Sequence, residues 1–133
     1  MKTELLELDT SDRTFLDLTS QVRGFTRDLG DGLVNVFVPH ATAGVAIIET
    51  GSGTESDLRD ALERLLPVQD IYAHRHGSLG HGRDHVVPAF ISASVTVPVI
   101  DGQPSLGTWQ SIVLVDTNPD NPHRNVRLSF LAA

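Results

Sequence analysis

The sequence contains no cysteine among its 133 residues. This absence excludes disulfides, zinc sites built from thiolates and a cysteine nucleophile. The chain also lacks any apolar run close to the roughly 20 residues that a helix needs to cross a bilayer. The first ten residues are too acidic, and their apolar run too short, for a signal peptide, so we expect a cytoplasmic protein.

Basic residues are scarce, because 10 lysines and arginines stand against 17 aspartates and glutamates, and the formal net charge is -7. Such a surface repels nucleic-acid phosphates and anionic lipids, so we expect neither nucleic acid nor a membrane as a partner. Hydrophobic residues make up 40% of the chain and charged residues 20%, which is an ordinary globular composition. With no internal repeat and no low-complexity linker, we predict one domain over residues 1–133.

Short runs of alternating or β-branched residues predict several strands. We expect strands at residues 5–8, 14–18, 33–39, 44–49, 108–116 and 125–131, and a strand-like stretch at 86–99 that begins near His85. Pro88 predicts an edge position or a bulge in that stretch. The glycine-rich residues 77–82 are expected to form a loop.

Two helices are expected between these strands. The principal one covers about residues 54–66, with Thr54 as its cap and an apolar face made by Leu58, Ala61, Leu62 and Leu65. A short N-terminal helix is capped by Thr19 or Ser20. This pattern predicts an α+β fold with a mainly antiparallel sheet or sandwich.

Four of the six histidines, His74, His76, His81 and His85, fall within twelve residues. Neutral imidazole is the commonest protein ligand for zinc and similar divalent ions, so the cluster predicts a metal site. His40 ends one predicted strand and adds a further donor, and Glu49 adds a carboxylate. The alternative interpretation is a solvated polar loop that happens to be rich in histidine.

Other residues each have a functional and a purely structural interpretation. Arg75 and Arg83 suit a substrate phosphate, which their forked donors would bind, or they are solvated charges. Asp84 orients an imidazole, or forms a surface ion pair. Residues 51–54 (GSGT) precede a helix and favour a simple turn over an anion site, since the lysine of a P-loop is missing.

Several separate segments together resemble the YjbQ family, which is named for a secondary thiamine-phosphate synthase activity. The matching segments are residues 36–44 (VFVPHATAG), Glu49, residues 72–74 (YAH), His85, residues 96–99 (TVPV) and residues 106–110 (LGTWQ). The resemblance covers nearly the whole chain, and the PHATA and LGTWQ segments are its most specific part.

The resemblance implies a mainly antiparallel β-sandwich that assembles as a homotrimer, with metal ions at a site built around histidines. It assigns His40, His74 and His85 as ligands and catalytic residues, and Glu49 as a further catalytic residue. Thr108 and Gln110, which flank Trp109, become substrate-binding residues. Residues 80–85 (GHGRDH) replace the usual Asp-Gly-Asn stretch of the family, so the loop ligands stay open, as does the choice between His74 and His76.

Two functional hypotheses follow. The first is an enzyme that uses a divalent metal, zinc or magnesium, on a phosphorylated small molecule. In the family's reaction a pyrimidine diphosphate is joined to a thiazole phosphate, and a metal with Arg83 or Arg75 would stabilise the departing pyrophosphate. The second is a non-catalytic trimer that binds a metal or an anion. A third interpretation, a structural interaction protein, leaves the histidines scattered over a solvated loop.

Overall fold

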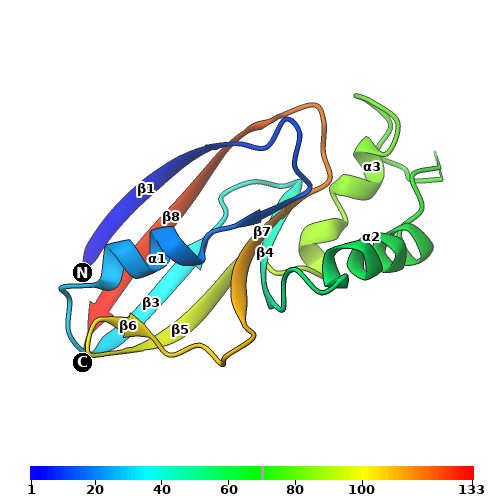
Figure 1. The fold of residues 1–133 in the computed structure, drawn as a ribbon. Helices are drawn as coiled ribbons and strands as arrows, with labels where there is room; N and C mark the ends of the chain where they lie inside the picture. The colour runs from blue at the N-terminus through cyan, green and yellow to red at the C-terminus, as the bar shows by residue number, and fades with distance from the viewer. Residues whose placement is uncertain (70) are drawn as a thin grey trace.

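The computed structural model describes residues 1–69 and 71–133 and contains two antiparallel sheets (Figure 1). The five-stranded sheet has the order β1 (Lys2–Asp9), β8 (His123–Ala132), β3 (Gly32–Phe37), β5 (Ser94–Ile100) and β6 (Gln103–Pro104). The three-stranded sheet has the order β2 (Phe15–Asp17), β7 (Ser111–Asp116) and β4 (Ala43–Ile48). The predicted α+β class with antiparallel sheets is confirmed.

The main core lies between the two sheets. Strand β8 shows why, because Val126, Leu128 and Phe130 are buried while the residues between them face outward. Strand β7 is buried on both sides: Ile112 and Leu114 face this core, and the other face of the strand meets a helical layer.

Two helices cover different surfaces. Helix α1 (Thr19–Thr26) contributes Val22 and Phe25 to the main core. Helix α2 (Thr54–Leu65) lies on the outer side of the three-stranded sheet, where Leu62 joins a second core cluster with Val113 and Val115.

Two details predicted for α2 are wrong. Thr54 is the first helical residue rather than the cap, because Gly53 occupies the cap position with φ 95, a conformation that favours glycine. Leu65 is 68% exposed, and Leu66 is buried in its place. Leu66 has left the helical conformation, with φ -132 and ψ 73, so its side chain turns back toward the core.

The stretch 86–99 differs most from prediction. Only Ser94–Ile100 forms a strand, and Val87–Ala89 forms a 3₁₀ turn, η1, with proline in its first turn. Val87 is fully buried beside α2, so tertiary packing overrides its strand preference. His85 therefore does not begin a strand: it ends a short helix, α3 (His81–Asp84), which forms within the stretch predicted as a loop.

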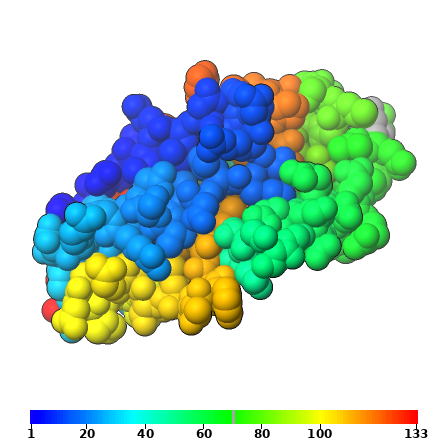
Figure 2. Space-filling view, viewed as in Figure 1, coloured from blue at the N-terminus to red at the C-terminus, as the bar shows by residue number. Residues whose placement is uncertain are grey.

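The α2 and α3 segments project together from one end of the sandwich, as the green region of Figure 2 shows. Both chain termini lie at the opposite end. Among the described residues, the helices are too short or too polar to span a bilayer.

Candidate metal centre

Three histidine side chains converge in this projecting region. His74, His81 and His85 each offer one ring nitrogen, and the three nitrogens lie within 4.8 Å of one another. The Nε2 atoms of His81 and His85 are 3.1 Å apart. Two nitrogens bound to one tetrahedral zinc ion stand about 3.3 Å apart, because each Zn–N bond is about 2 Å long. The His81–His85 pair already has this spacing, and His74 needs only a small movement to complete a site.

The local backbone explains this convergence. His81 begins α3 and His85 follows it in a right-handed helical conformation, so the two rings lie one turn apart on the same face. His74 comes from the irregular segment before α3. A Cβ on Gly82 would stand 2.5 Å from the carbonyl oxygen of His74, so this close approach of the two segments requires glycine.

His76 completes a cluster of four rings. Its centroid lies 4.3 Å from that of His74 and 4.5 Å from that of His81. Its side chain is exposed, and it does not belong to the group of three converging nitrogens. Of the two histidines that the sequence left as alternatives, the structure thus places His74 in the group and His76 at its edge.

The electrostatics favour the neutral rings that metals bind. Burial lowers the pKa of His85, and the neighbouring rings of His74, His81 and His76 lower it further. Desolvation, followed by the rings of His76 and His81, also lowers the pKa of His74. Crowded imidazoles resist protonation because their positive charges would repel one another, so both rings are available as ligands near neutral pH.

A carboxylate from another loop contacts this cluster. Asp120 lies between β7 and β8, and its Oδ2 is 2.7 Å from Nδ1 of His81. The same oxygen accepts a hydrogen bond from the backbone N–H of Ser78 at 2.9 Å. The Ser78 amide and then the His81 ring lower the pKa of Asp120, so the carboxylate stays ionised.

Arg83 and Asp84 form a buried pair behind the cluster. The Arg83 Nε donates to Asp84 Oδ1 at 2.8 Å, and Thr117 donates to the same oxygen at 2.6 Å. Arg83 is 8% exposed and also lies 3.5 Å from Glu63 of α2. The ion pair predicted at the surface is thus buried, and it anchors α3 against α2 and the β7–β8 loop.

His40 lies outside the group of three histidines within one chain. Its Nε2 accepts a hydrogen bond from the backbone N–H of Asn125 at 2.9 Å, which ties the turn after β3 to β8. Desolvation and then the neighbouring Arg124 lower the pKa of His40. The role of His40 as a ligand stays a prediction, and it requires a site shared between subunits of an oligomer.

Three predicted site residues lie near the far end of the three-stranded sheet: Glu49, Thr108 and Gln110. Glu49 follows β4 and is exposed, and Thr50 beside it meets Ser111 at 3.3 Å between their hydroxyl oxygens. Gln110 immediately precedes Ser111, and Thr108 lies two residues before Gln110. The six residues of β7 separate that end from the β7–β8 loop by about 17 Å at roughly 3.3 Å per residue. One ion therefore cannot bind Glu49 and the three histidines of the same chain.

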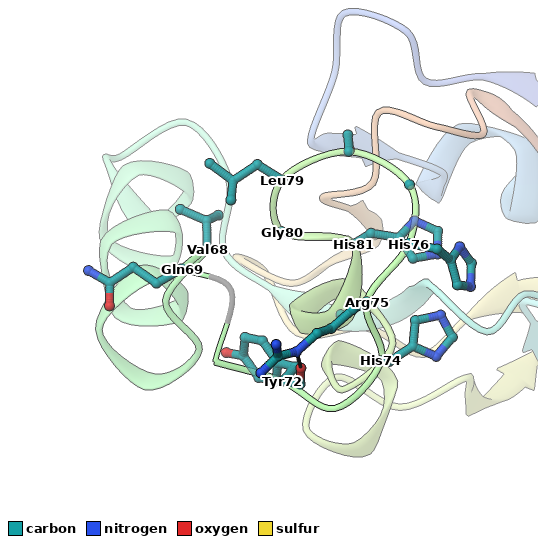
Figure 3. Close-up of a pocket in the computed structure, with 12 residues that line it drawn as sticks. Val68, Gln69, Tyr72, His74, Arg75, His76, Leu79, Gly80 and His81 are labelled. Carbon is teal, nitrogen blue, oxygen red and sulfur yellow. Dashed lines mark hydrogen bonds between the residues drawn. The ribbon is translucent and has the colours of Figure 1, made fainter.

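A cavity of about 300 Å³ adjoins the histidines (Figure 3). It is lined by Val68, Gln69, Tyr72, His74, Arg75, His76, Gly77, Ser78, Leu79, Gly80, His81 and Gly82. Figure 3 shows the rings of His74, His76 and His81 on one side and the apolar side chains of Val68 and Leu79 on the other. Arg75 lines the same cavity, and its Nε donates to the carbonyl oxygen of Tyr72 at 3.0 Å. The volume of the cavity lies at the low end of the range that is usual for small-molecule sites.

The sequence did not single out two residues of this candidate site. His81 belongs to the predicted histidine cluster but falls within residues 77–82, which were expected to form a loop, although its spacing of four from His85 is typical of two ligands on one helical turn. Asp120 carries no local signal, because it reaches the cluster from 39 positions further along the chain.

Taken together, the fold and site define an antiparallel α+β sandwich that carries a histidine cluster on a helical projection. The model of the family described as "UPF0047 protein YjbQ-like" matches residues 4–133. The chain therefore belongs to the YjbQ/UPF0047 family, as its motifs predicted.

Relatives and solved structures agree with this membership. The UPF0047 protein Rv2556c of Mycobacterium tuberculosis is 65% identical over 131 residues, which cover 98% of each chain. A UPF0047 protein of Methanothermobacter thermautotrophicus is 38% identical over 132 residues, covering 96% of this chain and 90% of the relative.

Among solved structures, the hypothetical protein APE1520 of Aeropyrum pernix matches with a TM-score of 0.86 at 30% identity and covers 100% of both chains. A Sulfolobus solfataricus protein, described as YbjQ-like and of unknown function, has a TM-score of 0.90 at 22% identity and covers 99% of this chain and 97% of its own. That second likeness shows the fold alone. None of these names states an activity.

Proposed function

We propose that this protein is a metal-dependent enzyme that binds a divalent ion through His74, His81 and His85 and acts on a phosphorylated small molecule. The observation that carries the proposal is the convergence of three ring nitrogens within 4.8 Å. Three protein ligands leave one position of a tetrahedral ion open, which is the pattern of catalytic rather than structural sites.

The donor set favours zinc over magnesium. Within the described part of the chain, the converging group consists of imidazoles alone. Magnesium prefers oxygen ligands and retains its waters, whereas imidazole suits zinc and related transition metals. When bound, such an ion would polarise a phosphoryl oxygen or activate a water.

The cavity beside the histidines supports a small phosphorylated substrate. Its volume is about 300 Å³, and Arg75 lies in its wall next to His74 and His76. The guanidinium of Arg75 would hold a phosphate while the metal neutralises charge on a departing pyrophosphate. A thiamine-phosphate synthase reaction, whether or not it is the main one, fits these requirements. Arg83 is less suited to this role, because its side chain is buried behind the cluster, with the residue 8% exposed.

We further propose the homotrimer that the family resemblance implies. The outer face of the five-stranded sheet exposes Leu5, Leu33, Phe37 and Leu131, and Leu33 pairs directly with Leu131. Leu5 and Phe37 lie on either side of Arg127 on the same face. A sheet face that exposes several large apolar side chains favours association. In such an assembly Glu49 or Thr108 of a second copy would be free to approach the histidines. Sedimentation should give three times the chain mass of 14.4 kDa, and Phe37→Glu should lower it.

Metal titration combined with an activity assay tests the main proposal. Wild type should bind one zinc per chain, and ion held at 100 times its Kd should raise the free energy of unfolding by about 2.7 kcal/mol. His85→Ala should abolish that binding. The matched control is His123→Ala, because His123 is an exposed histidine outside the cluster.

The outcomes separate the two functional classes. Formation of thiamine phosphate from the two phosphorylated precursors, lost in His85→Ala but kept in His123→Ala, supports the enzyme. Stoichiometric zinc binding without turnover of phosphorylated substrates favours the alternative, a non-catalytic metal-binding trimer. Wild-type protein that binds no zinc contradicts the metal site in both.

A further inference from the structure

One acidic side chain outside the group of three histidines is aimed at it. Asp120 Oδ2 is 2.7 Å from Nδ1 of His81, on the opposite side of the ring from the Nε2 that faces His85. Because an ionised carboxylate can only accept hydrogen bonds, this contact requires the proton to be on Nδ1. In the neutral ring the remaining lone pair is then on Nε2, which points into the histidine group.

We propose that Asp120 is a positioning residue that holds His81 in its Nδ1–H tautomer, so that Nε2 is presented as a metal ligand. A ligating histidine commonly donates its other N–H to a carboxylate, which fixes the orientation of the ring and raises its basicity. The role in metal binding rests on the proposed function above. The tautomer itself is a property of the metal-free chain and stands independently.

A second side chain, that of Asn118, contacts the same ring nitrogen of His81. The side-chain amide nitrogen of Asn118 lies 3.3 Å from the same Nδ1 of His81, and it could donate only if that nitrogen carried no proton. The contact to Asp120 is shorter, at 2.7 Å, and charge-assisted, so it determines the tautomer. Asn118 has another role, because its Oδ1 accepts a hydrogen bond from the backbone N–H of Asp120 at 2.7 Å.

The surrounding backbone is shaped to allow this contact. Gly77 has φ +74, and a Cβ at this position would stand 2.5 Å from Asp120 Oδ2 and 2.6 Å from His81 Nδ1. Any side chain there would push the carboxylate and the ring apart. The β7–β8 loop that carries Asp120 is anchored in turn, because the backbone N–H of Asn118 donates to buried Asp116 at 3.0 Å.

The proposal has a consequence for His85. With a lone pair on Nε2 of His81, the 3.1 Å contact between the two Nε2 atoms requires His85 to donate from its own Nε2. His81 and His85 should therefore occupy opposite tautomers in the metal-free protein. If His85 held a metal ion through Nε2, its proton would have to move to its own Nδ1, so metal binding would change the tautomer of His85 and leave that of His81 unchanged.

Ring nitrogen NMR tests the proposal directly. In metal-free wild type at about pH 7.5, long-range ¹H–¹⁵N spectra should show His81 as the Nδ1–H tautomer and His85 as the Nε2–H tautomer. In Asp120→Asn and Asp120→Ala, the His81 signals should move toward the Nε2–H tautomer. Asp28→Asn removes the same charge at a distant exposed position and should change neither ring.

Zinc affinity provides the second measurement. Competition with a chromophoric chelator should show a 10–100-fold loss of affinity in both Asp120 variants and none in Asp28→Asn. An Nε2–H tautomer of His81 in wild type overturns the proposal without any variant, as does wild-type affinity in both Asp120 variants. If wild type binds no zinc at all, the proposed function fails, but the spectra of the metal-free chain still decide the role of Asp120.

Discussion

Replacing Arg124 should destabilise this fold more than replacing any surface arginine. Arg124 lies on β8 with its side chain directed between the sheets, and it is 1% exposed. Its Nε and Nη2 donate to the two carboxylate oxygens of Asp116 at 2.7 and 2.9 Å, and Nη2 also donates to Thr42 at 2.8 Å. Asp116 is equally shielded, because its side chain is 1% exposed.

The magnitude follows from this burial. Arg124→Met leaves the Asp116 carboxylate in the interior with a hydroxyl donor, Thr10, and the Asn118 amide, but without its counter-charge. Removing one partner of a buried ion pair costs about 3–5 kcal/mol, since the remaining charge stays desolvated and unpaired. A domain of this size is stable by about 5–15 kcal/mol in total, so the variant should lose a large part of its stability.

Urea unfolding followed by far-UV circular dichroism measures this loss. Arg23→Met is the matched control, because Arg23 is an exposed arginine of α1 and lies outside both the buried ion pair and the sheet face proposed for the trimer. The control should change stability by less than about 0.5 kcal/mol. The double variant with Asp116→Leu should recover part of the loss, since both charges then leave the interior. Equal stability of Arg124→Met and the control, with no coupling in the double variant, would refute the reasoning.

Three further predictions concern single positions. Gly44→Ala should cost about 1–3 kcal/mol in urea unfolding, because its Cβ would overlap the carbonyl oxygen of Ile91, and a wild-type midpoint would count against this packing. Desolvation and Arg124 lower the pKa of His40, so its neutral form stabilises the fold above about pH 6.5, and this contribution is lost as the pH falls. His40→Gln should therefore lose less unfolding free energy than wild type between about pH 7.5 and 5.5. An equal loss in the two proteins would contradict the lowered pKa. Trp109→Ser should leave thermal stability within about 0.5 kcal/mol, because the indole is 73% exposed, and a larger loss would show that it is covered in the assembled protein.

Most of the fold could be predicted from local sequence patterns. The predictions that were wrong concern residues whose conformation is determined by tertiary packing. Alternation along β8 and the helical spacing in α2 are strong signals, because one face of each element is buried. Val87 belongs to a β-branched run that looks like a strand. Its burial against the α2 cluster depends on contacts that no local window contains.

Histidine density in the sequence pointed to the segment in which three histidine rings converge, and the predicted ligands His74 and His85 are two of the three. Whether His40 joins them depends on strand pairing, which gives its Nε2 a backbone partner at Asn125. Whether His81 joins them depends on a helical turn that follows Gly80 and contains Gly82, where sequence propensity predicts a loop.

The buried pair of Arg124 and Asp116 connects the interior of the sandwich to the histidine cluster. Asp116 ends β7 and accepts the backbone N–H of Asn118, which in turn holds Asp120 beside His81. The histidine cluster lies outside both sheets, but the loop that contacts it is anchored inside the sandwich. Loss of Arg124 should therefore weaken zinc binding as well as stability, although no atom of Arg124 belongs to the cluster. A variant that is destabilised but retains full zinc affinity would show that the loop holds its position without this anchor.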